Sequence, residues 1–71
     1  MKERVKSYDV VALTEDLPEH GLVRGQVGTA LDQWEEGVFE VEFSDDNGAT
    51  YALLTLREDQ LMVLHFESMA A

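Results

Sequence analysis

The sequence predicts an all-β protein: about five short antiparallel strands, with one long loop and one short helical turn before the last strand, curled into a small barrel. Three observations lead to this prediction. Apolar and polar residues alternate over Val38–Phe43, which is the period of a half-buried strand. Other short apolar runs are separated by turn-forming residues. No stretch of about ten residues shows the 3.6-residue period of an amphipathic helix.

The first strand is expected over Asp9–Leu13, a short apolar run bounded by turn-type residues. A long loop follows over Thr14–Gly21, because its proline cannot donate a hydrogen bond to a sheet and its acidic residues disfavour a pleated surface. Leu17 and Leu22 are expected to fold inward and cover one end of the core.

A second strand is expected over Gln26–Trp34. Gly28 within it has no side chain to pack, so we expect the strand to bend there or another segment to cross it closely. The connection Glu35–Gly37 ends in glycine, which predicts a three-residue hairpin loop whose last residue adopts a left-handed conformation.

The clearest strand of the sequence is Val38–Phe43, whose alternation predicts one buried, largely aromatic face. The residues on that face are Phe39, Val41 and Phe43. Ser44–Gly48 predicts a tight turn, since Asp and Asn side chains hydrogen-bond their own backbone. The chain is then expected to return as a strand over Ala49–Leu56.

The end of the chain predicts a helical turn over Arg57–Gln60 and a last short strand over Leu61–Phe66. The complete order is strand, long loop, three-stranded meander, helical turn and final strand, which is the order of an SH3-like barrel. We therefore expect a single domain over residues 1–66 and a frayed tail over residues 67–71.

The charge of the chain is strongly acidic, with a net charge of −10 from 15 acidic and 5 basic residues. Three of the basic residues are Lys2, Arg4 and Lys6, so that only Arg24 and Arg57 oppose fourteen acidic side chains from residue 7 onward. Such a surface repels phosphate backbones and anionic lipids. Direct nucleic-acid binding and membrane binding are disfavoured, and a basic protein partner is favoured.

The chain contains no cysteine, so neither a disulfide nor a thiolate zinc site can stabilise it. Its charged N-terminus runs directly into Tyr8 and Asp9 without an apolar signal region. The longest apolar run, Tyr51–Leu54, is far too short to span a membrane. These features favour a soluble, cytoplasmic protein.

Three segments carry a family resemblance: Asp9–Thr29 (DVVALTEDLPEHGLVRGQVGT), Tyr51–Leu56 (YALLTL) and Asp59–Leu61. They resemble a family of short bacterial proteins described as a domain of unknown function, and the likeness extends nearly to Leu64. The resemblance implies an SH3-like barrel that stands alone and is often encoded beside another small protein, as in toxin–antitoxin or immunity pairs. It implies no catalytic or binding residues.

A second likeness is carried by Gly25–Ala30, whose glycine pair is spaced as in KOW-type barrels of transcription and translation factors. Those barrels meet nucleic acid or polymerase through basic loops, which this chain lacks. The likeness therefore supports the barrel fold more than a role in transcription or translation.

No motif of the sequence predicts a catalytic, cofactor or metal site. The glycines of residues 21–28 are not followed by the Lys-Ser/Thr pair of a phosphate-binding loop, and Asp45–Gly48 lacks the ligand pattern of a calcium loop. His20 and His65 each lack a second histidine at ligand spacing. We therefore expect a protein that is not an enzyme and needs no cofactor.

Partner binding is expected on acidic residues of the long loop and of the alternating strand, together with one aromatic residue. The candidates are Glu15, Asp16, Glu19, His20, Trp34, Glu40 and Glu42. Trp34 either caps the core or remains partly exposed as a binding anchor. The favoured function is a non-enzymatic acidic protein-binding module, in one version the neutralising, antitoxin-like or immunity-like half of a two-protein pair.

An alternative function is structural: a self-associating barrel whose edge strand or apolar rim forms a homo-oligomer. A KOW-like accessory role in transcription or translation is a weaker alternative. An enzyme would need a pocket with perturbed carboxylates, which a chain of this length has little interior to form.

Overall fold

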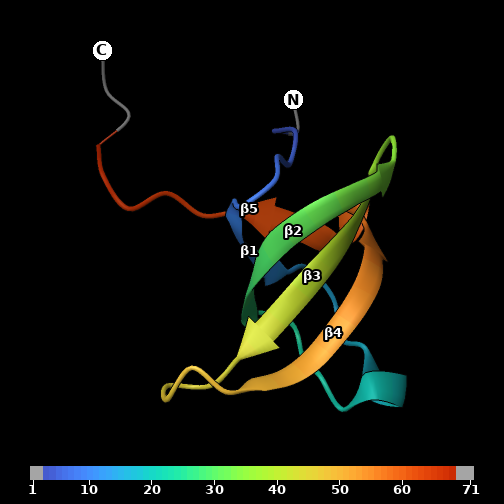
Figure 1. Cartoon of the computed structure of the whole chain (residues 1–71), viewed down its shortest axis with the longest axis vertical. Helices are drawn as coiled ribbons and strands as arrows, with labels where there is room; N and C mark the ends of the chain where they lie inside the picture. Colours follow the sequence, from blue (N-terminus) through green and yellow to red (C-terminus); the bar gives the residue numbers. More distant parts are fainter. Residues whose placement is uncertain (1–2, 69–71) are drawn as a thin grey trace.

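The computed structural model describes residues 3–68 and shows an all-β fold, as predicted (Figure 1). Its elements are β1 (Val10–Leu13), η1 (Pro18–His20), β2 (Val27–Glu35), β3 (Val38–Ser44), β4 (Thr50–Arg57), η2 (Glu58–Gln60) and β5 (Leu61–Val63), the two η elements being single 3₁₀ turns. The predicted long loop, meander, helical turn and short final strand are all present.

The five strands form one antiparallel sheet in the order β4-β3-β2-β1-β5. The sheet is curved, so that β1 and β5 lie behind the long strands β2, β3 and β4 in the view of Figure 1. In the part of the chain that the structure describes, β4 pairs only with β3 and β5 only with β1. The sheet therefore has two edge strands, and no hydrogen-bonded ladder joins them.

The core lies on the concave side of the sheet, where the alternation of β3 predicted it. Its three predicted side chains, Phe39, Val41 and Phe43, are at most 1% exposed. The other buried apolar residues of this cluster are Val5, Val11, Leu13, Leu17, Leu22, Ala30, Leu56 and Leu61. Leu17 and Leu22 pair with each other across the long loop and cover the core as expected.

Gly28 lies close against β3, so that of the two predicted possibilities, a bend or a close approach, the structure shows the close approach. A Cβ atom at this position would lie 2.7 Å from the carbonyl oxygen of Glu42 and 2.9 Å from a ring carbon of Phe43. The Phe43 ring therefore occupies the space that any other side chain would need.

The β2–β3 hairpin differs in detail from the prediction. Gly37 adopts the expected left-handed conformation, with φ of 77°. However, Glu35 still pairs with Val38, so the connection is one residue shorter than expected. Between Ala30 and Glu35 the register of β2 shifts twice against β3, a bulged region that the sequence did not predict.

The last strand ends at Val63 rather than at Phe66. Leu64 still donates one backbone hydrogen bond to Val10 (2.9 Å), but the pairing stops there. The reason is the backbone of Tyr8, which adopts a positive φ of 73° and donates to Ala30 instead (2.6 Å). The chain before β1 therefore turns away from β5. The expected tail over residues 67–71 extends beyond Ser68, outside the described residues.

Candidate functional site

The convex side of the sheet carries the candidate site. Residues directly opposite each other in a sheet share a face. Leu53 on β4 lies opposite Glu42 on β3, which in turn lies opposite Thr29 on β2. Two residues further along each strand, and therefore on the same face, Thr55 lies opposite Glu40. We call these five residues the outer face.

The two glutamates of the outer face, Glu40 and Glu42, are half-buried and form no ion pair with any residue of the range 3–68. Glu42 accepts a hydrogen bond from the hydroxyl of Thr50, and no described residue pairs with the carboxylate of Glu40. Arg57, at the end of β4, pairs with Asp59 instead (3.1 Å). The outer face therefore presents two negative charges that the described part of the chain does not neutralise.

An exposed apolar side chain lies directly beside these charges. Leu53 is 53% exposed, although it occupies the middle of a strand. Burying a leucine stabilises a complex by about 1.5–3 kcal/mol, so a partner that covers this exposed leucine beside the carboxylates of β3 gains stability from doing so. The next residue, Leu54, points to the concave side and is only partly buried.

β4 is also the longer of the two edge strands. From Asn47 to Leu56 the sequence contains no charged residue and no proline. Apart from its ladder with β3, no described segment forms a backbone hydrogen bond to residues 51–56. We call the side of residues 52–56 that faces away from β3 the β4 edge.

Tyr51 closes one end of the β4 edge. It lies at a register shift between β3 and β4 and packs its ring against Phe43, with ring centroids 6.4 Å apart. Its hydroxyl accepts a hydrogen bond from the side-chain amide of Gln26, just before β2 (3.1 Å). The start of β4 is thereby attached to the segment just before β2, whereas residues 52–56 form no such contact with the described chain.

The loop residues predicted for partner binding are all exposed. They are Glu15, Asp16, Glu19 and His20. Glu15 accepts a hydrogen bond from Gln60 (3.2 Å), and Asp16 accepts one from the backbone N–H of Arg24 (2.8 Å). These two carboxylates therefore help to hold the loop in shape.

Trp34 is 63% exposed and does not cap the core. It lies in the bulged end of β2, next to Glu35 and Glu36. In Figure 1 the β2–β3 hairpin lies at the upper right, while η1 lies at the lower right, far from it. The structure therefore does not bring Trp34 together with the loop residues, whereas Glu40 and Glu42 lie on the strand between the two regions.

Leu53 and the β4 edge were missed by the sequence-based prediction of the site. A signal for them was present, because the longest uncharged run of a strongly acidic chain lies in this strand. The run could be read as a strand from the sequence, but its position at the edge follows only from the pairing of the strands.

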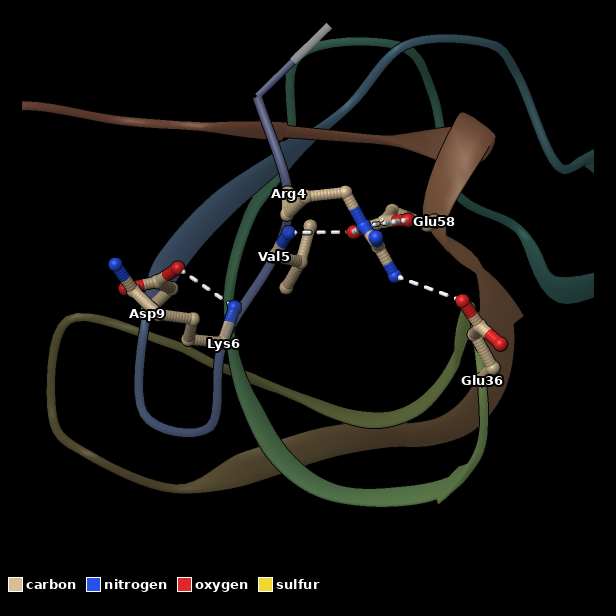
Figure 2. Close-up of polar contacts among 6 residues, drawn as sticks. All are labelled: Arg4, Val5, Lys6, Asp9, Glu36 and Glu58. Atoms are coloured by element: carbon tan, nitrogen blue, oxygen red, sulfur yellow. Dashed lines mark hydrogen bonds and ion pairs between the residues drawn. The ribbon is translucent and has the colours of Figure 1, made fainter.

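A second charged cluster is formed by the N-terminal segment and Glu58, and in it the cation Arg4 forms ion pairs (Figure 2). The Arg4 guanidinium contacts the Glu58 carboxylate (3.1 Å) and reaches Glu36 (3.6 Å). Glu58 also accepts the backbone N–H of Val5 (2.6 Å), whose side chain is buried in the core. We call residues 3–9 together with Glu58 the N-terminal clasp.

Backbone contacts continue the N-terminal clasp toward β1. The N–H of Lys6 donates to the Asp9 carboxylate (2.8 Å), as Figure 2 shows. Glu3 contacts the His65 ring (2.8 Å), so the segment also touches the chain after β5. A shallow groove of about 370 Å³ remains between these two segments, lined by Lys6, Asp9 and His65 among others.

Two further features bear on what the surface can bind. Within residues 3–68, no three His, Asp or Glu side chains lie close enough together to hold a metal ion. None of the helical segments in this range is long and apolar enough to cross a membrane.

Comparison with known proteins identifies one family. A profile described as a domain of unknown function (DUF4926) matches residues 7–63, which is most of the chain and agrees with the resemblance noted in the sequence. No curated protein and no solved structure matches the chain. The matched region begins after Arg4 and Val5 of the N-terminal clasp and includes the whole sheet.

Proposed function

The chain belongs to the DUF4926 family, a domain of unknown function, and from this premise we propose that it is a non-enzymatic, acidic module that binds a basic protein. The observation that supports this most is the outer face, where Glu40 and Glu42 lie beside the exposed Leu53 and pair with no cation of the described chain. The long loop adds further acidic residues, and the bulged end of β2 adds the exposed Trp34.

Charge and apolar surface serve different steps of such binding. A net charge of −10 attracts a basic partner and speeds the encounter, and it repels acidic proteins and nucleic acids. The affinity then comes from burying apolar side chains at the centre of the contact. The outer face offers both within one stretch of β3 and β4.

In the more specific version of this proposal the chain is the neutralising half of a two-protein pair, antitoxin-like or immunity-like. Covering a cationic, nucleic-acid-facing surface of a toxic partner would need an acidic surface of this kind. The likeness to SH3-like and KOW-type barrels stays a prediction, as does a location in the cytoplasm.

The test is affinity capture from an extract of the source organism with the tagged full chain at low and at high salt. The informative variant is Glu40→Gln with Glu42→Gln, which removes both charges and keeps the side-chain shapes. The matched control is Asp46→Asn with Glu67→Gln, which removes two exposed charges elsewhere.

We expect the wild-type chain and the control to retain one basic protein at low salt and lose it at high salt, because exposed charges are screened. The outer-face variant is expected to lose it at both. Capture of no protein at any salt, or equal capture by the two double variants, contradicts the proposal.

The uncharged β4 edge also favours the second candidate function, self-association into a homo-oligomer. Light scattering over a range of concentrations separates the two functions. A monomer at every concentration excludes self-association, and a mass that rises to a dimer in the absence of any partner supports it.

A further inference from the structure

We infer that the basic partner docks on the β4 edge as an added sixth strand, through an extended segment in which Lys or Arg alternates with apolar residues. The inference rests on the proposed function and specifies how the same surface would be used. Four properties of β4 support it. They are the backbone groups that no described segment pairs with, the lack of features that block strand pairing, the apolar and acidic surfaces on its two sides, and the net negative charge of the chain.

The backbone of the β4 edge offers hydrogen bonds that nothing in the described chain uses. In an edge strand, every second residue directs its N–H and C=O groups away from the sheet. Residues 52–56 have no backbone partner besides β3 among residues 3–68. An extended segment laid alongside would satisfy these groups, which is the common mode of strand addition.

The β4 edge also lacks the features that keep edge strands from pairing. Edge strands are usually protected by shortness, by charged side chains, by proline or by a bulge. β5 has only three residues, whereas β4 has eight. In β4 the sole charge is Arg57, at its end, and the sole register shift lies at its start, beside Tyr51.

The side chains of an added strand would meet two different surfaces. On the concave side they would contact Leu54, which is only partly buried, so apolar residues fit there. On the convex side they would lie beside Leu53 and Thr55, with the carboxylates of Glu42 and Glu40 one strand further. Lys and Arg fit this side because their apolar stems can cover Leu53 while their charges face the carboxylates.

Charge decides between a basic segment and a second copy of this chain as the occupant. A second copy would offer another uncharged edge but would bring its own net charge of −10. Bringing two such bodies together adds repulsion, whereas a basic segment removes it. Strand pairing with a copy is therefore disfavoured and becomes an outcome that the experiment can detect.

The probe is a nine-residue peptide alternating lysine with valine, compared with a peptide in which glutamate replaces lysine. Amide hydrogen exchange of the full chain is measured with and without each peptide. We expect the lysine peptide to slow exchange at residues 52–56 and not in β5, with an effect that weakens as salt is raised. The glutamate peptide is expected to have no effect.

The informative variant is Leu53→Lys, which places a charge on the β4 edge next to the incoming lysines. Its matched control is Met62→Lys on β5, because Leu53 and Met62 are both 53% exposed. We expect Leu53→Lys to weaken binding of the lysine peptide by about tenfold or more, and Met62→Lys to leave it within about twofold.

Three outcomes overturn the inference: no protection of residues 52–56 at peptide concentrations up to roughly 1 mM, equal effects of the two variants, or protection that grows with protein concentration alone. The last would identify a second copy as the occupant. The proposed function fails separately, if the Glu40/Glu42 variant captures the basic partner as well as the wild type does. Since Leu53→Lys could disturb β4, the protection measured on the wild-type chain provides an independent test.

Discussion

The N-terminal clasp and the β4 edge differ in whether their acidic side chains meet a cation. In the N-terminal clasp, Arg4 lies between Glu58 and Glu36, and the neighbouring Val5 is buried (Figure 2). Beside the β4 edge, the carboxylate of Glu40 has no partner among the residues that the structure describes, and Leu53 remains exposed. Within the described residues, the chain therefore neutralises one region with its own cation and leaves the carboxylates and the leucine of the other region uncovered.

The difference follows from where the cations lie along the sequence. Three of the five basic residues precede residue 7. Within the described residues, the segment that carries Arg4 and Lys6 contacts η2 through Val5 and β2 through Tyr8. Arg4 pairs with Glu58 and Glu36, and no ion pair among the described residues involves Glu40 or Glu42. The described cations therefore neutralise one acidic region and not the other.

The largest effect is expected from a change at the close contact between β2 and β3. Gly28→Val places side-chain atoms within 3.0 Å of the Glu42 backbone and the Phe43 ring, where only the backbone or a core side chain could shift. We expect a loss of more than about 3 kcal/mol in the free energy of unfolding. Thermal unfolding followed by circular dichroism measures it. The neighbouring Thr29→Val, on the convex side, serves as control and is expected to change little; equal stability of the two variants would show that the strands can separate there.

The next largest effect on stability is expected at Glu58, and it differs from the effect expected at its ion-pair partner Arg4. Glu58→Ala removes the acceptor of both Arg4 and the Val5 N–H, and the Glu58 side chain is only 17% exposed. We expect a loss of about 1.5–3 kcal/mol. Arg4→Ala removes one side of an exposed pair and is expected to cost about 0.2–1 kcal/mol.

Chemical denaturation of the two variants side by side measures this difference. If Arg4→Ala were as damaging as Glu58→Ala, the ion pair rather than the backbone hydrogen bond would hold the N-terminal clasp.

A smaller effect is expected from the apolar residue of the N-terminal clasp. Val5→Ala removes two buried methyl groups, since Val5 is 6% exposed, and is expected to cost about 1.5 kcal/mol. The same change at Val23, which is 58% exposed, provides the control and is expected to have almost no effect. Denaturant midpoints of the two alanine variants measure both. Equal midpoints would mean that the burial of Val5 does not contribute to the free energy of unfolding.

The smallest effect on stability is expected at the β4 edge itself. Leu53→Lys replaces an exposed side chain opposite Glu42, and we expect the free energy of unfolding to change by no more than about 0.5 kcal/mol. Met62→Lys is expected to behave alike. Thermal unfolding checks both. A large destabilisation by Leu53→Lys alone would show that Leu53 supports the fold, and the exposed leucine would need no partner to explain it.

Several features of the fold could be predicted because neighbouring residues determine them. The alternation of Val38–Phe43 placed Phe39, Val41 and Phe43 in the core, where the structure has them. Ser44–Gly48 was predicted as a turn, and Asp45 accepts the N–H groups of Asn47 and Ala49 within it. Gly28 was predicted as a point of close approach, although not the residues that approach it.

The candidate site could be predicted only in part. Glu40 and Glu42 were named, and both lie on the outer face. Leu53 was not named, because a leucine in a strand is buried or exposed according to what lies across from it. The N-terminal clasp was not predicted either, since its main contacts join residues 53 and 54 positions apart in the chain.

The sequence by itself determined the all-β class, the central turn, the buried face of β3 and the excess of negative charge, because each depends on residue type and on spacing over a few positions. Only the tertiary structure decided which strands become edges, which acidic residues meet a cation and that Trp34 remains exposed. These depend on which distant segments pair. Pairing is determined by the packing of the whole core. Local features such as the bulge in β2 and the left-handed conformation of Tyr8 change the register or the direction of the backbone.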